Sequence, residues 1–418
     1  MFKYKITRCS QWSVKFIVNR ENMKINKIKK CCLIISFTIP SSMQLSYAAE
    51  AEVKIDPSVQ KYIGDSSVLN RDKFFNLHTS PTSSELTTAD LQTITEELNA
   101  GFGRSFWSPL SASGEILYPS TDFAITQGAI NIEQQKNNVL YPYSDRRMVA
   151  TDHPKNIMRE GNNPVEGARW AADYFENYYT DETRPLFYEP MNEPFVHASD
   201  FVDGGWDAEK NLVVQGQMTE WFKQIALEFH RRNIDTKVIG FSSAWPSVEL
   251  NDFSHWEERQ KRFMDVAGDA MDAFSFHLYD GVNVTGQDNI RSGSNAEAIM
   301  DLIETYSHYK WDTVKPHALT EYGGIIDGYE GVDYSDARSS QELPSLNHLL
   351  FSALEREDRI LTSIPFITGK AAWFYQANNF QPYSAAIWRP DPSKVVGNKV
   401  NGFLLTEKAK FFQLWSEV

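Results

Sequence analysis

Short apolar segments alternate with amphipathic helical segments along most of the chain, and this alternation limits the folds that it can adopt. With helices between them, strands are predicted at 72–78, 103–107, 147–150, 185–193, 237–241, 273–279, 317–322 and 370–375. These strands are too apolar for a sheet that is wet on one face, so both faces must be covered. About eight strand–helix units favour a (β/α)8 TIM barrel of the α/β class over an open doubly wound sheet.

The first 48 residues differ from the rest of the chain. They carry nine Lys and Arg residues against one acid, Glu21, and then an apolar run at 31–39 followed by small residues. This order is typical of a secretory signal with a basic extension, and translation can also start at Met23. The apolar run is too short for a stable transmembrane helix, although a membrane anchor is the alternative. We therefore expect a secreted protein, extracellular or periplasmic, with a polar arm at 49–70 and one barrel domain at 71–418.

The charge of the chain limits its partners. The net charge is −14, and removal of the leader, which carries +8, leaves −22. Such an acidic protein should repel nucleic acid and anionic membranes. All three cysteines, Cys9, Cys31 and Cys32, lie in the leader, so the mature chain is predicted to have no disulfide and no cysteine-bound metal.

Two glutamates lie where predicted strands end. Glu193 ends strand four in Asn-Glu-Pro, where the proline forces a turn, and Glu321 ends strand seven in Thr-Glu-Tyr-Gly. Active sites of such barrels form at the carboxyl ends of the strands. Glycoside hydrolysis requires at least two carboxyl groups that face each other across the bond to be cleaved. Glu189 shares a face with Glu193, but we expect it to be a buried, paired residue of the barrel.

Four motifs resemble the large clan of retaining (β/α)8 glycosidases. They are Asn-Glu-Pro at 192–194, His-x-Tyr at 277–279, Thr-Glu-Tyr-Gly at 320–323 and an aromatic strand eight at Trp373. The resemblance implies that Glu193 is the general acid/base and Glu321 the nucleophile, with no cofactor and no metal. It also implies that Asn192 binds the 2-hydroxyl of the sugar being cleaved and that Tyr279 hydrogen-bonds the nucleophile.

Within this clan, the segments at 75–81, 103–109 and 188–197 are most similar to glycoside hydrolase family 86. That family contains β-agarases and β-porphyranases that act on red-algal galactans. The resemblance implies an endo-acting, retaining β-galactan hydrolase, an agarase or a porphyranase. We also expect a monomer. Members usually carry β-sandwich domains after the barrel, so we expect that such modules are either truncated or absent after Val418.

Further residues are candidates for substrate contacts, and each also has a structural interpretation. The tryptophans can stack on sugar faces or belong to the core, the histidines can be cleft residues or satisfied polar groups, and Arg104 can steer the nucleophile or form an ordinary ion pair. These candidates are His78, Arg104, Trp107, His153, His197, Trp245, His277, Tyr279 and Trp373.

The sequence leaves the substrate open. Agarose and porphyran differ by a 6-sulfate on one sugar, and a basic residue facing that sulfate would decide between them; Arg104, Arg146 and Arg147 are candidates. The alternatives are the same mechanism on a mannan or glucan, or a non-catalytic carbohydrate-binding barrel. A retaining mechanism implies carboxyl groups about 5–5.5 Å apart, against about 6.5–9.5 Å for an inverting one.

Overall fold

The computed structural model describes residues 2–8, 14–18, 51–56, 58–112, 116–244, 246–281, 290–325 and 334–417. They fall into two compact units, Met1–Ser67 and Val68–Val418. The first unit holds an antiparallel sheet in the order β2-β1-β3, formed by β1 (Phe2–Arg8), β2 (Val14–Val18) and β3 (Ala51–Ile55). The apolar run at 31–39 lies outside the described residues, so the signal segment stays a prediction. Of the helices in the described ranges, none has the length and apolar character needed to span a membrane.

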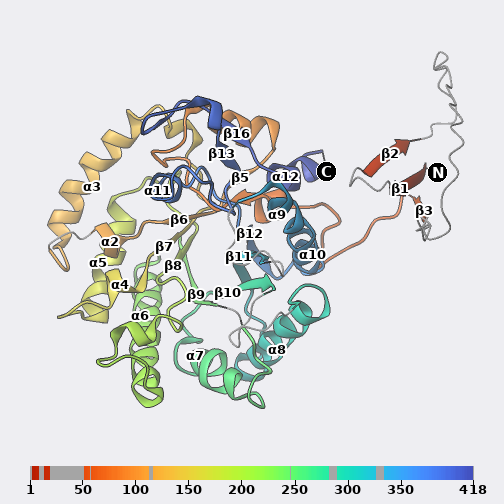
Figure 1. Ribbon diagram of the computed structural model, residues 1–418. Helices are drawn as coiled ribbons and strands as arrows, with labels where there is room; N and C mark the ends of the chain where they lie inside the picture. Colours follow the sequence, from red (N-terminus) through yellow and green to blue (C-terminus); the bar gives the residue numbers. More distant parts are fainter. Residues whose placement is uncertain are drawn as a thin grey trace, which may run out of the picture. The chain divides into compact units, whose positions relative to one another are not determined.

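The second unit is a (β/α)8 barrel, as predicted (Figure 1). A parallel seven-stranded sheet runs in the order β12-β11-β10-β9-β8-β7-β6, and β4 pairs with β5, which only Gly103 separates from β6. The backbone N–H of His78, just after β4, donates to the carbonyl of Ile367, just after β12, at 2.9 Å and so joins the first strand to the last. The barrel strands are β4 (Asn76–Leu77), β5 (Gly101–Phe102), β6 (Arg104–Phe106), β7 (Val149–Thr151), β8 (Phe187–Glu189), β9 (Lys237–Ser243), β10 (Ala273–Asp280), β11 (His317–Gly324) and β12 (Ile360–Pro365).

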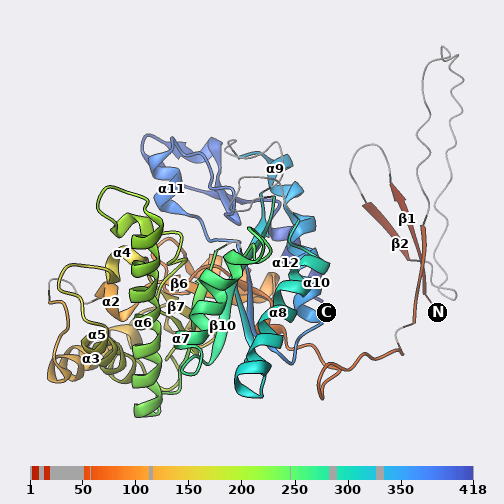
Figure 2. The same ribbon diagram turned by 90° about the horizontal axis from the view of Figure 1, so that it is seen from below.

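Helices surround the strands, and Figure 2 shows α9 and α11 at one end of the barrel. Two helix starts follow directly from the sequence: Thr87 forms a capping box with Asp90, and Asn163 caps α5 just before a first-turn proline. The helices are α1 (Thr88–Gln92), α2 (Pro109–Ala112), α3 (Thr121–Lys136), α4 (Pro154–Ile157), α5 (Pro164–Asn177), α6 (Ala208–Arg232), α7 (Arg262–Ala267), α8 (Ser294–Trp311), α9 (Asp336–Gln341), α10 (Leu343–Leu354), α11 (Ala372–Ala377) and α12 (Ala409–Trp415). Two small hairpins pair β13 (Trp388–Pro390) with β16 (Phe403–Leu405) and β14 (Val395–Val396) with β15 (Lys399–Val400).

The core has two parts, which follow from the alternation of side chains along each strand. A large cluster fills the space between strands and helices and includes Tyr188, Trp221 and Phe274. A smaller cluster contains one residue from each of six successive strands: Val149, Phe187, Ile239, Ala273, Ala318 and Ile364. Because Phe187 and Glu189 share a face of β8, the carboxylate of Glu189 also points into the barrel.

Three predictions about the strands are wrong. Strand eight is β12, not 370–375; that aromatic segment forms most of helix α11, so Trp373 is not at a strand end. Strand four ends at Glu189, four residues before Glu193. The first strand covers only 76–77 of the predicted 72–78, because a 3-10 helix at Arg71–Lys73 takes up its start.

Candidate active site

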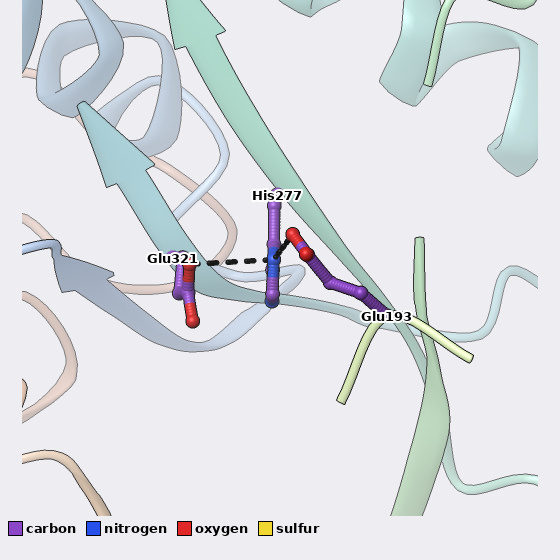
Figure 3. Close-up of side chains that lie close together, drawn as sticks. All are labelled: Glu193, His277 and Glu321. Atoms are coloured by element: carbon purple, nitrogen blue, oxygen red, sulfur yellow. Dashed lines mark hydrogen bonds and ion pairs between the residues drawn. The ribbon is translucent and has the colours of Figure 1, made fainter. Parts of the chain in front are cut away.

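The two predicted carboxylates lie together at the carboxyl end of the barrel. Glu321 belongs to β11 and is buried, whereas Glu193 lies in the turn after β8 and is partly exposed. Glu193 has a φ of +46°, which is strained for a residue with a side chain, and its backbone N–H donates to Ser242 Oγ at 3.2 Å. One oxygen of each carboxylate and a ring nitrogen of His277 lie within 4.8 Å of one another (Figure 3). The chain thus brings together two acids that are 128 residues apart.

His277 on β10 lies between the two carboxylates (Figure 3). Its Nδ1 is 2.7 Å from Glu193 Oε1 and 3.5 Å from Glu321 Oε2, while its Nε2 is 3.1 Å from the hydroxyls of Ser242 and Thr320. Burial lowers the pKa of His277, but the negative charges of Glu321 and Glu193 outweigh burial and raise that pKa. The raised pKa favours the charged ring, in which Nδ1 donates to Glu193 Oε1 and faces Glu321 Oε2.

Glu321 is held as an anion by several donors. Tyr279 donates its hydroxyl to Glu321 Oε2 at 2.8 Å, Arg104 donates to Oε1, and His78 Nε2 is 3.3 Å from Oε1. Burial opposes ionisation, yet the charges of His277 and Arg104 and the hydrogen bond from His78 together lower the pKa of Glu321. The hydrogen bond predicted between Tyr279 and the strand-seven acid is present.

Arg104 is the centre of a buried polar network beneath the carboxylates. Its Nη2 donates to Glu189 Oε2 at 2.5 Å and to Asn192 Oδ1 at 2.7 Å, and the residue is 1% exposed. Glu189 is fully buried and also accepts from Thr320 at 2.9 Å and from Ser275. The expected burial and pairing of Glu189 are confirmed. Arg104 forms ion pairs with both Glu189 and Glu321 and also lines the larger hollow, so its role in steering the nucleophile stays a prediction.

Two hollows meet at the two carboxylates, since Glu193 and Glu321 line both. The larger hollow, about 1180 Å³, extends over the loops of the first three strands and of the last; it is lined among others by His78, Phe106, Trp107, His153, Asn192 and Trp373. The smaller hollow, about 240 Å³, extends toward α9, α10 and α12; it is lined among others by Tyr279, Gly323, Arg338, Glu342, Tyr383 and Lys408.

Aromatic rings line the larger hollow, and the sequence predicted only some of them. Trp107 is 40% exposed beside Tyr174, and Trp373 is 67% exposed on α11. Reasoning from sequence missed Phe366, which follows strand eight and lines both hollows with its ring 5.0 Å from that of His78. It also missed Phe106, which is 49% exposed. The apolar run at 360–365 ends in Pro365, and this pattern in the sequence indicates a strand end next to Phe366.

The remaining candidates are less central. His153 lines the larger hollow, and its ring is 4.5 Å from that of His197, which pairs with Asp200 at 2.9 Å and lines neither hollow. Trp245 lies outside the described residues. Two arginines considered for sulfate line neither hollow: Arg146 pairs with Asp235, and Arg147 pairs with Asp72 and Asp145.

Among the described residues, Glu193, His277 and Glu321 lie close enough together for one atom of each to bind the same metal ion. A metal ion needs a deprotonated imidazole nitrogen, whereas the raised pKa of His277 favours a proton there. The three residues therefore fit a proton-sharing arrangement better than a metal centre.

No family model matches the chain. It is 36% identical over 400 residues to beta-porphyranase A of Phocaeicola plebeius, which covers 92% of this chain and 50% of that protein. It is 28% identical over 409 residues to a beta-agarase of Pseudoalteromonas atlantica, covering 88% of this chain and 78% of the relative.

Two solved structures share the fold. A beta-porphyranase of glycoside hydrolase family 86 from the human gut bacterium Bacteroides plebeius is 34% identical with a TM-score of 0.70, over 87% of this chain and 60% of that one. A crystal structure of BuGH86 in complex with neoagarooctaose is 26% identical with a TM-score of 0.73, over 87% of this chain and 63% of that one. The chain thus spans 50% of the length of beta-porphyranase A and about three fifths of the length of the two solved structures.

Proposed function

Because the chain belongs to glycoside hydrolase family 86, we propose that it is an endo-acting, retaining glycosidase that cleaves β-linkages in an agar-type galactan, agarose or porphyran. One observation carries this proposal: oxygens of Glu193 and Glu321 lie within 4.8 Å of each other. Retaining glycosidases hold their carboxyl groups about 5–5.5 Å apart, whereas inverting ones need about 6.5–9.5 Å for a water molecule between acid and sugar.

In this mechanism Glu321 attacks the anomeric carbon and Glu193 protonates the oxygen of the leaving sugar. The C–O bond breaks, and a covalent glycosyl-enzyme forms on Glu321. Water then attacks the anomeric carbon, gives its proton to Glu193 and releases Glu321. The lowered pKa of Glu321 supports its role as the ionised nucleophile. His277 Nδ1, at 2.7 Å, can donate to Glu193 when Glu193 becomes an anion after the first step.

Asn192 is proposed to bind the 2-hydroxyl of the sugar at the cleaved bond. Its Oδ1 accepts from Arg104, which orients the amide nitrogen as a donor, and the residue lines the larger hollow. His78, Trp107, His153 and Trp373 line the same hollow and are proposed to contact sugars there. The exposed ring of Trp373 offers an apolar face for stacking.

Endo action is supported by the two hollows, which extend from the carboxylates in different directions. A polymer that crosses both carboxylates then fills subsites on both sides of the cleaved bond. The choice of an agar-type galactan rests on the relatives, which are named for porphyran, funoran and agarose. We further propose export by the leader at 1–48, action as a monomer, and no need for a cofactor or a metal.

The test is the release of oligosaccharides by the purified protein from agarose and from native and desulfated porphyran, with cellulose and mannan alongside. Release from a galactan, with the β-anomer formed first in NMR, would support the proposal. Glu321→Gln should abolish turnover without unfolding the protein. On an aryl β-galactoside whose leaving group departs without a proton, azide should restore turnover to Glu193→Ala, because it replaces water in the second step. Activity on cellulose or mannan alone would refute the galactan assignment, and first release of the α-anomer would refute retention.

A further inference from the structure

Part of the larger hollow lies on the outer side of the barrel strands, away from the carboxylates. In β6, Arg104 points inward to Glu189, so the next residue, Ser105, points outward. Ala150 on β7 is paired in register with Ser105 and belongs to the large cluster between strands and helices. Both nevertheless line the hollow, as does Met148, which shares a face with Ala150. The hollow therefore continues from the strand ends onto the outer face of β6 and β7.

This outer groove is lined by three apolar or aromatic side chains and three uncharged polar ones: Trp107, Met148, Tyr179, Gln135, Asn138 and Thr183. Gln135 lies near the end of α3, and α3 packs closely against α5. A Cβ atom on Gly128 of α3 would lie only 2.3 Å from the carbonyl oxygen of Asn177 on α5. The end of α3 thereby forms one rim of the groove.

Trp107 gives the groove a fixed aromatic surface. Its ring makes edge contacts with Tyr174 at 5.2 Å and with Tyr179 at 6.2 Å between centroids, yet the residue is 40% exposed. Two ring contacts hold the indole in place, so it loses little freedom when a ligand binds. The apolar face of an aromatic ring can stack on the face of a sugar that carries C–H groups.

The polar side chains offer hydrogen bonds to hydroxyl groups. Asn138 Oδ1 accepts the backbone N–H of Leu140 at 2.9 Å, which orients the amide nitrogen as a donor. Gln135 adds a second amide, and Thr183 adds a hydroxyl. A few such polar groups around an apolar surface are typical of a site for a small polar molecule.

The charges near the groove favour an unsulfated sugar. Among the described residues that line the larger hollow, Arg104 is the one with a permanent positive charge, and it faces the inner side of β6. Asp145 also lines the hollow, and its carboxylate is paired with Arg147. The groove thus offers dipoles rather than a net positive charge, which suits an uncharged sugar better than a sulfate ester.

We propose that the outer groove binds an unsulfated sugar unit of the galactan chain, remote from the bond that is cleaved. The inference rests on the proposed function, because one hollow connects the groove with Glu193 and Glu321. The groove and the carboxylates lie on opposite faces of β6, so a sugar in the groove does not touch the reacting atoms. It should therefore tighten the binding of long chains without changing the chemical step.

The experiment measures by calorimetry the Kd of a tetrasaccharide and a dodecasaccharide, prepared from agarose and from native porphyran. Every protein carries Glu321→Gln, so that the oligosaccharides stay intact. Gln135→Ala removes one amide from the groove. Gln134→Ala is the matched control, because Gln134 lies on the same helix but is exposed and lines neither hollow. Trp107→Leu keeps an apolar side chain against Tyr174 and tests the aromatic surface.

Gln135→Ala should raise the Kd of the dodecasaccharide about 3- to 10-fold, as for one lost hydrogen bond, and leave that of the tetrasaccharide unchanged. Trp107→Leu should weaken the binding of the dodecasaccharide at least as much, and Gln134→Ala should change neither Kd. An unchanged dodecasaccharide Kd in both groove variants, or an equal loss for both lengths, would refute the outer groove and leave the glycosidase standing. If the Glu321→Gln protein bound neither galactan and the native chain cleaved neither, the proposed function itself would be refuted.

Discussion

Replacing Arg104 with methionine should destabilise the barrel by about 3–5 kcal/mol, the range for removing one partner of a buried ion pair. The side chains of Arg104 and Glu189 are both fully buried, and Arg104 Nη2 lies 2.5 Å from Glu189 Oε2. At an effective dielectric constant of about 20 this contact alone is worth about 7 kcal/mol, and the desolvation of the guanidinium offsets part of it. Among the described residues, the variant leaves Glu189 with the hydroxyls of Ser275 and Thr320 as donors.

The assay is urea unfolding at pH 7, followed by tryptophan fluorescence. Arg104→Lys keeps the charge but loses the planar fork, so it should be intermediate. Arg146→Met is the control, because its partner Asp235 has a side chain that is 78% exposed, and its cost should be about 1 kcal/mol. Adding Glu189→Gln to Arg104→Met should recover part of the loss, because the unpaired buried charge is then removed.

The same variant should alter the pH dependence of catalysis. Arg104 helps to lower the pKa of Glu321, so its removal should move the acid limb of the kcat/KM profile to higher pH. A carboxylate whose pKa is lower in the folded than in the unfolded protein stabilises the fold at pH values above its unfolded-state pKa. This stabilisation is lost as the pH falls through the folded-state pKa. The stability gap between the two proteins should therefore narrow on acidification. An Arg104→Met variant within about 1 kcal/mol of the native protein at pH 7, or an unmoved acid limb, would refute the reasoning.

Three further predictions concern single contacts. Tyr279→Phe removes a hydrogen bond to the charged Glu321 and should lower kcat about 10- to 100-fold in steady-state assays, with an unchanged circular dichroism spectrum. Glu85 accepts the backbone N–H groups of residues 370 and 372 at 2.8 Å, next to Trp373, so Glu85→Gln should raise KM for long oligosaccharides several-fold while kcat on short ones stays the same. Glu304 has its pKa lowered to about 2, despite burial, by His317 and two arginines. The native protein should therefore lose stability as the pH falls from about 4.5 to about 2, because Glu304 becomes protonated in that range. Glu304→Gln should not show this part of the loss when urea unfolding is measured across the same range.

The sequence predicted the parts of the site that local patterns determine. Glu321 lies on an apolar strand that ends in two glycines, Gly323 and Gly324, and two residues of one strand, His277 and Tyr279, point to the same side. The burial of Glu189 followed from the same alternation. These features depend only on strand periodicity and on the rule that parallel strands end together.

The rest depends on tertiary packing, which a local pattern does not reveal. The aromatic run at 372–375 has strand-like composition, but it follows Ala371 at a φ of +51° and forms helix α11, with Tyr375 buried and Trp373 exposed. Helix α3 was missed because it buries only Ala124 and Gly128, so it shows no apolar stripe. The final position of Glu193 was also missed, since its left-handed backbone is held by tertiary contacts rather than by its own preference.

The reacting groups lie on strands, whereas the hollows are lined largely by helices and loops, and this difference separates catalysis from the choice of substrate. Arg104, Glu189, His277 and Glu321 are buried strand residues, and their mutual hydrogen bonds fix the carboxylates before any substrate arrives. The hollows are instead lined largely by helices and loops beyond the strand ends, such as α9 with Arg338. Changes in the buried network should therefore weaken the cleavage of every substrate, because they move the reacting groups. Changes in side chains that line the hollows outside this network should alter mainly the choice among substrates, because the carboxylates keep their donors.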